Sequence, residues 1–292
     1  MAYDIQRRVL SIQSHVVHGY CGNRSATFPL QVLGYEVDCI NTVQFSNHTQ
    51  YKSHSGSAIN EEEILQLIKG LKDNQLFGYT HMLTGYTRSS SVLSIFTNVV
   101  EELREANKDF VYLCDPVLGD HGLLYVPDEM IGAYKKTLHI PNILTPNQFE
   151  LELLTGMEVV KITDAIAAIN SLHKLGPKTV VITSFELEGD GNLYCIGSQL
   201  GTDPVAFKFP KLEANFVGSG DLFAALFLGW FHMGLKTALK NTLQTMQSIL
   251  HRTLKAAGKE RGPKALELQL VRGKQDIETP PETIELSQVN LQ

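Results

Sequence analysis

Short apolar runs alternate with stretches of helical periodicity along most of the chain. The apolar runs, rich in branched residues, predict buried strands at 9–13, 36–45, 81–84, 110–114, 142–144 and 178–183. The periodic stretches predict helices at 91–107, 148–154 and 163–175. Strands separated by helices indicate βαβ units, so the pattern favours an α/β fold with a mainly parallel sheet covered by helices on both faces.

A further helix is predicted after Asn60, which suits a helix N-cap. Glu61, Glu62 and Glu63 follow in the first turn, where negative charge meets the positive end of the helix dipole. Ile64, Leu67, Ile68 and Leu71 come next at helical spacing, and we expect them to form one apolar face.

The end of the chain differs from its centre. Segments 194–198 and 205–209 are separated by a few polar residues and predict an antiparallel pair at one edge of the sheet. The tail from Lys274 is polar and carries Pro280 and Pro281, so we expect residues 278–292 to be loosely ordered. No linker divides the chain, and one domain over 1–292 is predicted.

Polar residues follow most predicted strands, and in open parallel sheets ligands bind at the carboxyl ends of the strands. We therefore expect these side chains to converge on one rim: Ser14, His15, Ser46, Asn47, His48, Thr84, Tyr86, Asp115, Thr145, Asn147, Thr183 and Ser184.

Composition narrows the class of protein. Of 292 residues 43% are hydrophobic and 19% charged, with a net charge of −6, which argues against a disordered chain and against nucleic-acid binding. The four cysteines are scattered and suggest neither a zinc cluster nor a disulfide scaffold. The longest apolar run, 222–231, is too short to span a membrane, and Met1–Arg8 shows no signal peptide, so a cytoplasmic protein is expected.

The most informative segment is 218–221 (GSGD), which opens an apolar helix. Glycines let backbone amides approach a ligand closely, and the first amides of a helix lack internal partners, so together they make an anion site. Asp221 lies beside that anion and could take a proton from an attacking hydroxyl. The alternative is a helix N-cap with a first-turn acid and no further role. No dinucleotide, Walker or protein-kinase motif is present.

At this point the sequence resembles a known family. The GSGD segment is similar to the anion-hole signature of the ribokinase-type small-molecule kinases, and seven further blocks resemble the pyridoxal kinases. These blocks lie at 9–16, 19–24, 28–34, 44–49, 83–87, 114–120 and 145–150. The resemblance runs from about Arg8 to about Ile277 and implies a ribokinase-like three-layer sandwich.

The resemblance also implies the chemistry, namely ATP-dependent phosphorylation of the 5′-hydroxymethyl group of pyridoxal, pyridoxine and pyridoxamine. Asp221 matches the catalytic base, and Gly218, Ser219 and Gly220 match the anion hole. The family often carries Thr at the position of Ser219, and either hydroxyl can donate a hydrogen bond.

On the vitamer side, Ser14 and Thr49 match residues that bind the polar edge of the pyridine ring. Val43 and Tyr86 match its apolar and aromatic walls, and Cys21 stands at another wall position. His48 lies at the rim of the same site. Without the family, Val43 and Tyr86 would be interpreted as core residues, and His48 is equally compatible with a structural role.

On the nucleotide side, the resemblance implies contacts with ATP and with Mg²⁺ or another divalent cation, held mostly through water. The implied nucleotide residues, besides the anion hole, are Asp115, Asp120, Tyr125, Asn147, Glu150, Thr183, Ser184, Leu212 and Phe216. The implied metal residues are Asp115, Thr145 and Glu150. For Glu150 the alternative is a first-turn helix acid, with Asn147 as the cap.

Further family expectations are a monovalent cation such as K⁺ or Na⁺ near the nucleotide, and a homodimer. The loop from Asp120 to Tyr125 is shorter than in vertebrate-like members, so its behaviour as a lid is open. Two other functions remain as alternatives: a hydroxymethylpyrimidine-type alcohol kinase, and a protein that binds B6 vitamers without turnover.

Overall fold

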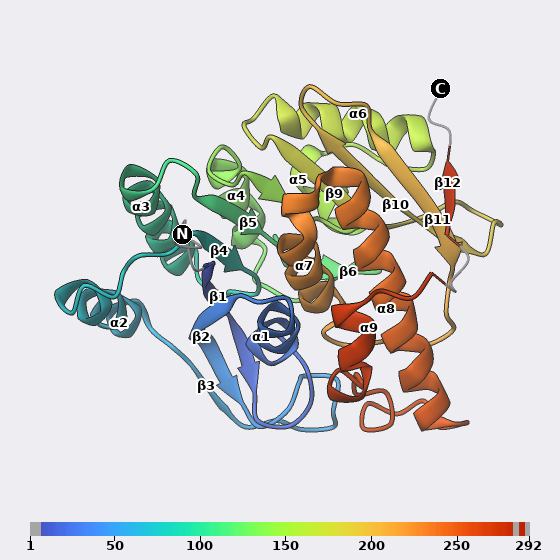
Figure 1. Cartoon of the computed structure of the whole chain (residues 1–292), viewed down its shortest axis with the longest axis horizontal. Coiled ribbons are helices and arrows are strands. Elements are labelled where there is room, and N and C mark those ends of the chain that lie inside the picture. Colours follow the sequence, from blue (N-terminus) through green and yellow to red (C-terminus); the bar gives the residue numbers. More distant parts are fainter. Residues whose placement is uncertain (1–6, 283–285, 290–292) are drawn as a thin grey trace, which may run out of the picture.

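A computed structural model of the chain describes residues 7–282 and 286–289. Its centre is a ten-stranded sheet in the order β12-β11-β10-β9-β8-β5-β4-β1-β2-β3 (Figure 1). Its strands are β1 (Arg8–Val16), β2 (Glu36–Phe45), β3 (Gly56–Ala58), β4 (His81–Thr84), β5 (Val111–Cys114), β8 (Ile143–Leu144), β9 (Thr179–Glu186), β10 (Asn192–Gln199), β11 (Val205–Pro210) and β12 (Ser287–Val289). A separate hairpin joins β6 (Gly119–Asp120) and β7 (Leu123–Leu124).

Helices connect and cover these strands. They are α1 (Asn23–Val32), α2 (Glu61–Asp73), α3 (Ser90–Ala106), α4 (Glu129–Thr137), α5 (Gln148–Thr155), α6 (Ile162–His173), α7 (Ser219–Trp230), α8 (Leu235–Ala257) and α9 (Lys274–Glu278), with short 3-10 turns η1 (Phe231–Met233) and η2 (Val271–Gly273). In the part of the chain that the structure describes, no helix combines the length and apolarity needed to cross a membrane.

The sheet is parallel in its middle and antiparallel at both edges. Strands β2, β1, β4, β5, β8 and β9 run parallel, as the pattern predicts. The predicted antiparallel pair is confirmed as β10 and β11. The antiparallel region is larger than predicted, because β10 also pairs antiparallel with β9, β12 with β11, and β3 with β2.

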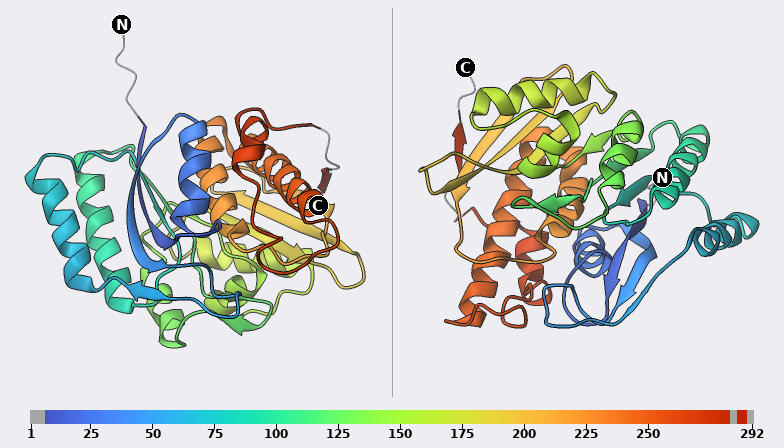
Figure 2. Two further views of the ribbon diagram at one scale, coloured as in Figure 1. Left: turned by 90° about the horizontal axis from the view of Figure 1, so that it is seen from below. Right: turned by 180° about the vertical axis from the view of Figure 1, so that it is seen from behind.

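Two apolar cores lie on opposite faces of the sheet, because side chains alternate along each strand. Leu10 and Ile12 of β1 join the core under α2, α3, α4, α5 and α6, whereas Val9 joins the core under α1, α7, α8 and α9. Figure 2 shows the two helical layers with the sheet between them. The predicted three-layer arrangement is confirmed.

The helix after Asn60 is also confirmed, with a capping box between Asn60 and Glu63. Ile64 and Ile68 of the predicted apolar face are buried, but Leu67 is 49% exposed. The reason is that α2 packs chiefly against one helix, α3, and buries only a narrow stripe.

The tail is more ordered than predicted. Residues 274–278 form α9, where Ile277 is fully buried, and Ser287–Val289 form a strand paired with β11. The expected loose ordering is therefore wrong for residue 278 and for 287–289. Residues 283–285 and 290–292 lie outside the described part, as do residues 1–6, on which most of the signal-peptide prediction rests.

Candidate active site

The strand order reverses between β1 and β4, since β1 has β2 on one side and β4 on the other. Ligands of open α/β sheets bind outside the carboxyl ends of the strands at such a point. Tyr86 and Asp115 follow β4 and β5 directly, as predicted. Ser14, Thr183 and Ser184 instead lie within β1 and β9, which run further than predicted.

The N-terminus of α7 faces this region. Gly218 is its N-cap in the left-handed conformation (φ 78°), and a Cβ there would lie 2.0 Å from the Tyr20 carbonyl oxygen. Leu222 N–H makes the first bond of the helix, to Gly218 O (3.0 Å), and no described side chain caps the turn. The amides of residues 219–221 are therefore free for an anion.

Two hydroxyls hold the turn before α7. Ser25 Oγ donates to Gly218 O (2.8 Å), and Ser219 Oγ donates to Phe216 O (3.0 Å). Ser219 is thus a first-turn residue whose hydroxyl braces the loop, and Gly218 rather than Ser219 is the N-cap.

Asp221 follows in the first turn of α7 and is only 8% exposed. Its Oδ2 accepts a hydrogen bond from Gly22 N–H (2.7 Å). Burial raises the pKa of the Asp221 carboxyl, while the Gly22 amide and the Cys21 thiol act in the opposite direction. Gly22 has φ 56°, and a Cβ there would lie 1.9 Å from Ser14 O, so this close approach requires glycine.

Two of the predicted vitamer residues, Cys21 and Ser14, lie beside this aspartate. Ser14 is buried with its Oγ 3.8 Å from Cys21 Sγ. Burial, followed by the charge of Asp221, raises the pKa of the Cys21 thiol, so Cys21 is neutral and suits a wall position. Val43 is buried and Tyr86 is half-buried, with its hydroxyl donating to Tyr125 O (3.2 Å).

His48 is buried, and both of its ring nitrogens have partners within the protein. Nε2 lies 3.3 Å from Glu267 Oε1, and Nδ1 accepts a hydrogen bond from Gln50 N–H (3.3 Å). These contacts favour the structural interpretation of His48. Its neighbour Thr49 is exposed.

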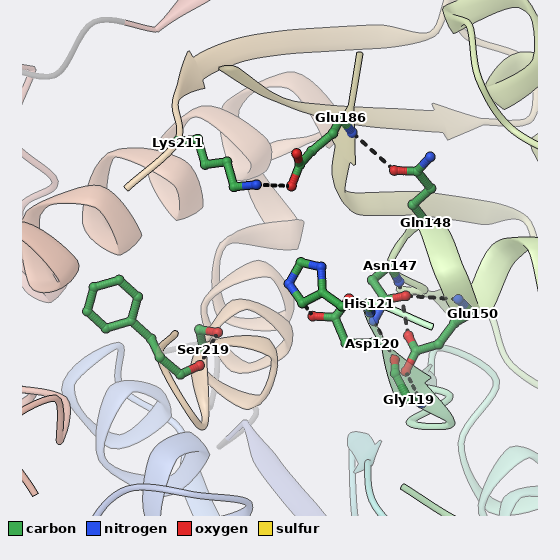
Figure 3. A network of polar contacts seen from close by, with 10 residues as sticks. Gly119, Asp120, His121, Asn147, Gln148, Glu150, Glu186, Lys211 and Ser219 are labelled. Carbon is green, nitrogen blue, oxygen red and sulfur yellow. Dashed lines mark hydrogen bonds and ion pairs between the residues drawn. The ribbon is translucent and has the colours of Figure 1, made fainter. Parts of the chain in front are cut away.

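Three of the predicted nucleotide residues, Asp120, Asn147 and Glu150, form a second group around the start of α5 (Figure 3). Asn147 and Glu150 make a capping box, and Asn147 Nδ2 also donates to Gly119 O (2.8 Å). Glu150 Oε1 accepts from Leu118 N–H (2.9 Å) and from Gly119 N–H (3.4 Å). Glu150 therefore joins the helix start to the loop before the β6–β7 hairpin.

Buried carboxyl groups connect the two groups. Asp115 Oδ1 accepts from Thr145 Oγ1 (3.3 Å), and Asp115 Oδ2 lies 3.8 Å from where a Cβ of Gly220 would stand. Burial, then the charges of Glu150 and Asp221, raise the pKa of Asp115 well above its ordinary range. Burial also raises the pKa of Glu150, although its backbone donors act in the opposite direction.

These carboxylates bear directly on metal binding. Within residues 7–282 and 286–289, no lysine, arginine or histidine pairs with Asp115, Glu150 or Asp221, and no three His, Cys, Asp or Glu are arranged to hold an ion directly. Oxygen donors without a counter-charge suit a hydrated divalent cation.

The short loop from Asp120 to Tyr125 is a tight hairpin. His121 (φ 48°) and Gly122 (φ 78°) form its two-residue turn, which needs two positive φ angles. Asp120 pairs with the neighbouring His121 (3.6 Å), and Leu123 and Tyr125 are exposed.

Other predicted residues lie apart from these contacts. Thr183 N–H donates to Pro146 O (3.0 Å), next to the α5 cap. Among the described residues, no hydrogen bond or ion pair joins Thr49, Ser184 or Leu212 to either group. Phe216 and Leu212 pack against the core beside α7.

Sequence reasoning missed Gly22, Ser25 and Glu267. Gly22 lay within a block of family resemblance, but its partner Asp221 is 199 residues away and no local pattern connects them. Glu267 stood in a segment to which no function was assigned.

Comparison with known proteins identifies the family. The sequence model of the phosphomethylpyrimidine kinase family matches residues 36–265. The pyridoxal kinase of Bos taurus is 46% identical over 298 residues, covering 94% of this chain and 96% of the relative. That of Arabidopsis thaliana is 46% identical over 285 residues, covering 94% and 92%. The chain belongs to the pyridoxal kinase family.

Solved pyridoxal kinases share the fold. The enzyme from Leishmania donovani in complex with ADP and pyridoxine has a TM-score of 0.91 and 33% identity, covering 97% of this chain and 99% of that one. The Plasmodium falciparum protein with AMP-PNP and PL has a TM-score of 0.82 and 29% identity, covering 98% and 99%. The expected ribokinase-like fold and family membership are confirmed.

Proposed function

We propose that this chain phosphorylates the 5′-hydroxymethyl group of pyridoxal, and also of pyridoxine and pyridoxamine, using ATP, and so forms pyridoxal 5′-phosphate in vitamin B6 salvage. The observation that carries the proposal is the start of α7, where uncapped amides stand beside a buried, hydrogen-bonded Asp221. The pyridoxal kinases with this fold, solved with ADP and a B6 vitamer, support the choice of substrates.

In this mechanism Asp221 accepts the proton of the vitamer hydroxyl as that oxygen attacks the γ-phosphorus. The amides of residues 219–221 stabilise the charge that develops on the transferred phosphoryl group. Burial raises the pKa of Asp221, which increases its strength as a base compared with an ordinary aspartate. Ser14, Thr49, Val43 and Tyr86, with Cys21, surround the pyridine ring.

For the nucleotide, we assign phosphate contacts to the anion hole, Asp120, Asn147, Thr183 and Ser184, with Tyr125, Leu212 and Phe216 nearby. Asp115 would hold a hydrated Mg²⁺ together with Thr145 and Glu150, mostly through water. Glu150 would act through water because backbone N–H donors already occupy its carboxylate. Bound Mg²⁺ supplies neutralisation of the β and γ oxygens. A K⁺ or Na⁺ ion near the nucleotide, one kinase domain, a homodimer and a cytoplasmic location complete the proposal.

The second candidate is a hydroxymethylpyrimidine-type kinase, which the matching family model favours by its description. The purified chain with ATP and Mg²⁺ tests both on a panel of pyridoxal, pyridoxine, pyridoxamine and hydroxymethylpyrimidine. We expect higher kcat/KM for the vitamers, and Asp221→Ala should lower kcat by about 10²–10⁴-fold. Preferred turnover of hydroxymethylpyrimidine, or vitamer binding without turnover, would refute the proposal.

A further inference from the structure

Glu267 is a partly buried carboxylate that the mechanism above does not use. It lies after α8, between Leu266 and Leu268, which are both buried in the protein interior. Its own side chain is 11% exposed and turns toward the loops that follow β1 and β2. The segment is therefore anchored by leucines and presents one charge to the vitamer side of the site.

The Glu267 carboxylate accepts hydrogen bonds from two loops. Oε2 accepts from Tyr20 N–H (3.0 Å), in the loop between β1 and α1. Oε1 accepts from Tyr51 OH (3.0 Å) and lies 3.3 Å from His48 Nε2, both in the loop between β2 and β3. The Glu267 carboxylate lies close to the backbone of the β1–α1 loop, since a Cβ on Gly19 would be only 2.2 Å from Glu267 Oε1.

The donors and acceptors of the side chains around Glu267 match one another. Because His48 Nδ1 accepts from Gln50 N–H, the ring is left to donate from Nε2 to Glu267. The His48 ring lies 4.8 Å from that of Tyr51. Although burial acts to raise the pKa of Glu267, the bonds from His48, Tyr20 and Tyr51 lower it overall, so the carboxylate is charged. We call Glu267, His48, Tyr51 and the Tyr20 amide the Glu267 clasp.

The clasp is connected to the reacting groups through the backbone. Gly22, two residues after Tyr20, donates a hydrogen bond from its backbone N–H to the Asp221 carboxylate. The Tyr20 carbonyl lies against Gly218. On the other loop, His48 precedes Thr49. We propose that Glu267 is a positioning residue that holds both loops over the vitamer and so aligns the Gly22 amide with Asp221.

This inference rests on the proposed kinase function, and its kinetic test separates vitamer from nucleotide. Glu267→Gln keeps the size of the side chain but removes the charge and one acceptor oxygen. We expect the KM for pyridoxal to rise about tenfold or more, since hydrogen bonds to a charged group are being weakened. The KM for ATP should change by less than about twofold, because among the described residues no side chain of the clasp contacts the α5 cap and only the Tyr20 backbone adjoins the anion hole. Glu260→Gln, an exposed neighbour, is the control and should match the parent.

Hydrogen exchange on the full chain tests the clasp without using activity. In Glu267→Gln, residues 17–22 and 46–51 should exchange faster than in the parent, while α6 remains unchanged. If Glu267→Gln does not fold, Tyr51→Phe removes a single bond and should shift the same two readouts in the same direction by a smaller amount.

Equal increases in both KM values, or unchanged exchange in the two loops, would overturn the clasp. A parent protein that phosphorylates no vitamer would instead refute the proposed function, and the exchange experiment would still decide whether Glu267 holds the loops.

Discussion

Gly218→Ala tests the geometry of the anion site most directly. Gly218 has φ 78°, and a Cβ there meets the Tyr20 carbonyl at 2.0 Å. Gly156, the C-cap of α5, is a matched control, because it has φ 72° and nothing within 4 Å of its Cβ position. The two substitutions impose the same left-handed backbone on alanine, and only one of them adds a collision.

The expected magnitudes follow from that difference. The left-handed conformation costs an alanine about 1 kcal/mol at either position. At Gly218 the Cβ must also move by more than about 1 Å to reach ordinary contact, and a displacement of that size in an active site costs about 100-fold in rate. We therefore expect Gly156→Ala to lose about 1 kcal/mol with normal kcat, and Gly218→Ala to lose about 2–4 kcal/mol together with about 100-fold in kcat.

Urea unfolding gives the free energy of unfolding of each variant, and release of ADP in the presence of pyridoxal gives kcat. The difference between the two variants isolates the contact with Tyr20. If both lost the same stability and Gly218→Ala kept its kcat, the close approach of the α7 turn to the β1–α1 loop would have no catalytic role.

Four further outcomes are expected. Burial raises the pKa of Asp221, so its neutral form stabilises the fold, and this stabilisation is lost as the pH rises through the folded-state pKa. Asp221→Asn should therefore raise the urea midpoint at alkaline pH. It should leave the midpoint unchanged at pH values below the ordinary aspartate pKa of about 3.9. The raised pKa of Asp221 also places the acid limb of the pH profile of kcat/KM for pyridoxal above the ordinary aspartate pKa. An acid limb at or below that pKa would contradict the role of Asp221 as the base. Asn147→Ala should cost about 1 kcal/mol of stability and raise the KM for ATP more than that for pyridoxal. A chain ending at Leu286 lacks β12 and leaves the edge of β11 unpaired. Light scattering should then show more self-association than in the parent, because unpaired strand edges pair with other chains. Equal scattering would argue against the idea that β12 protects the edge of β11.

Local patterns were sufficient for the framework of the fold. The strand at 178–183 is one branched apolar run, and the Asn60 helix start is a capping box, so both depend on neighbours in sequence. The α7 turn was found for the same reason, since glycines and the aspartate lie within four positions. Two features depend on packing that the local pattern does not carry: Leu67 has helical spacing but is 49% exposed, and Ile277, a single apolar residue in a polar tail, is fully buried near α8.

The vitamer side of the site could not be predicted in the same way. The contact between Gly22 and Asp221 joins residues 199 positions apart, and that between Tyr20 and Glu267 joins residues 247 apart. Neither contact leaves a periodic signal, because each depends on how β1, α7 and the segment after α8 come together in the folded sheet. The family resemblance identified Asp221 but not the groups that hold it.

The position of Glu267 in the chain has a consequence for biogenesis. A ribosome produces residues 14–51 early, and the carboxylate that holds their loops follows 216 residues after Tyr51. A nascent chain halted before that residue could form much of the sheet yet would lack an organised vitamer pocket. Competence to bind the vitamin would then mark a chain that has been translated past Glu267, and products terminated before that residue would not sequester the vitamin.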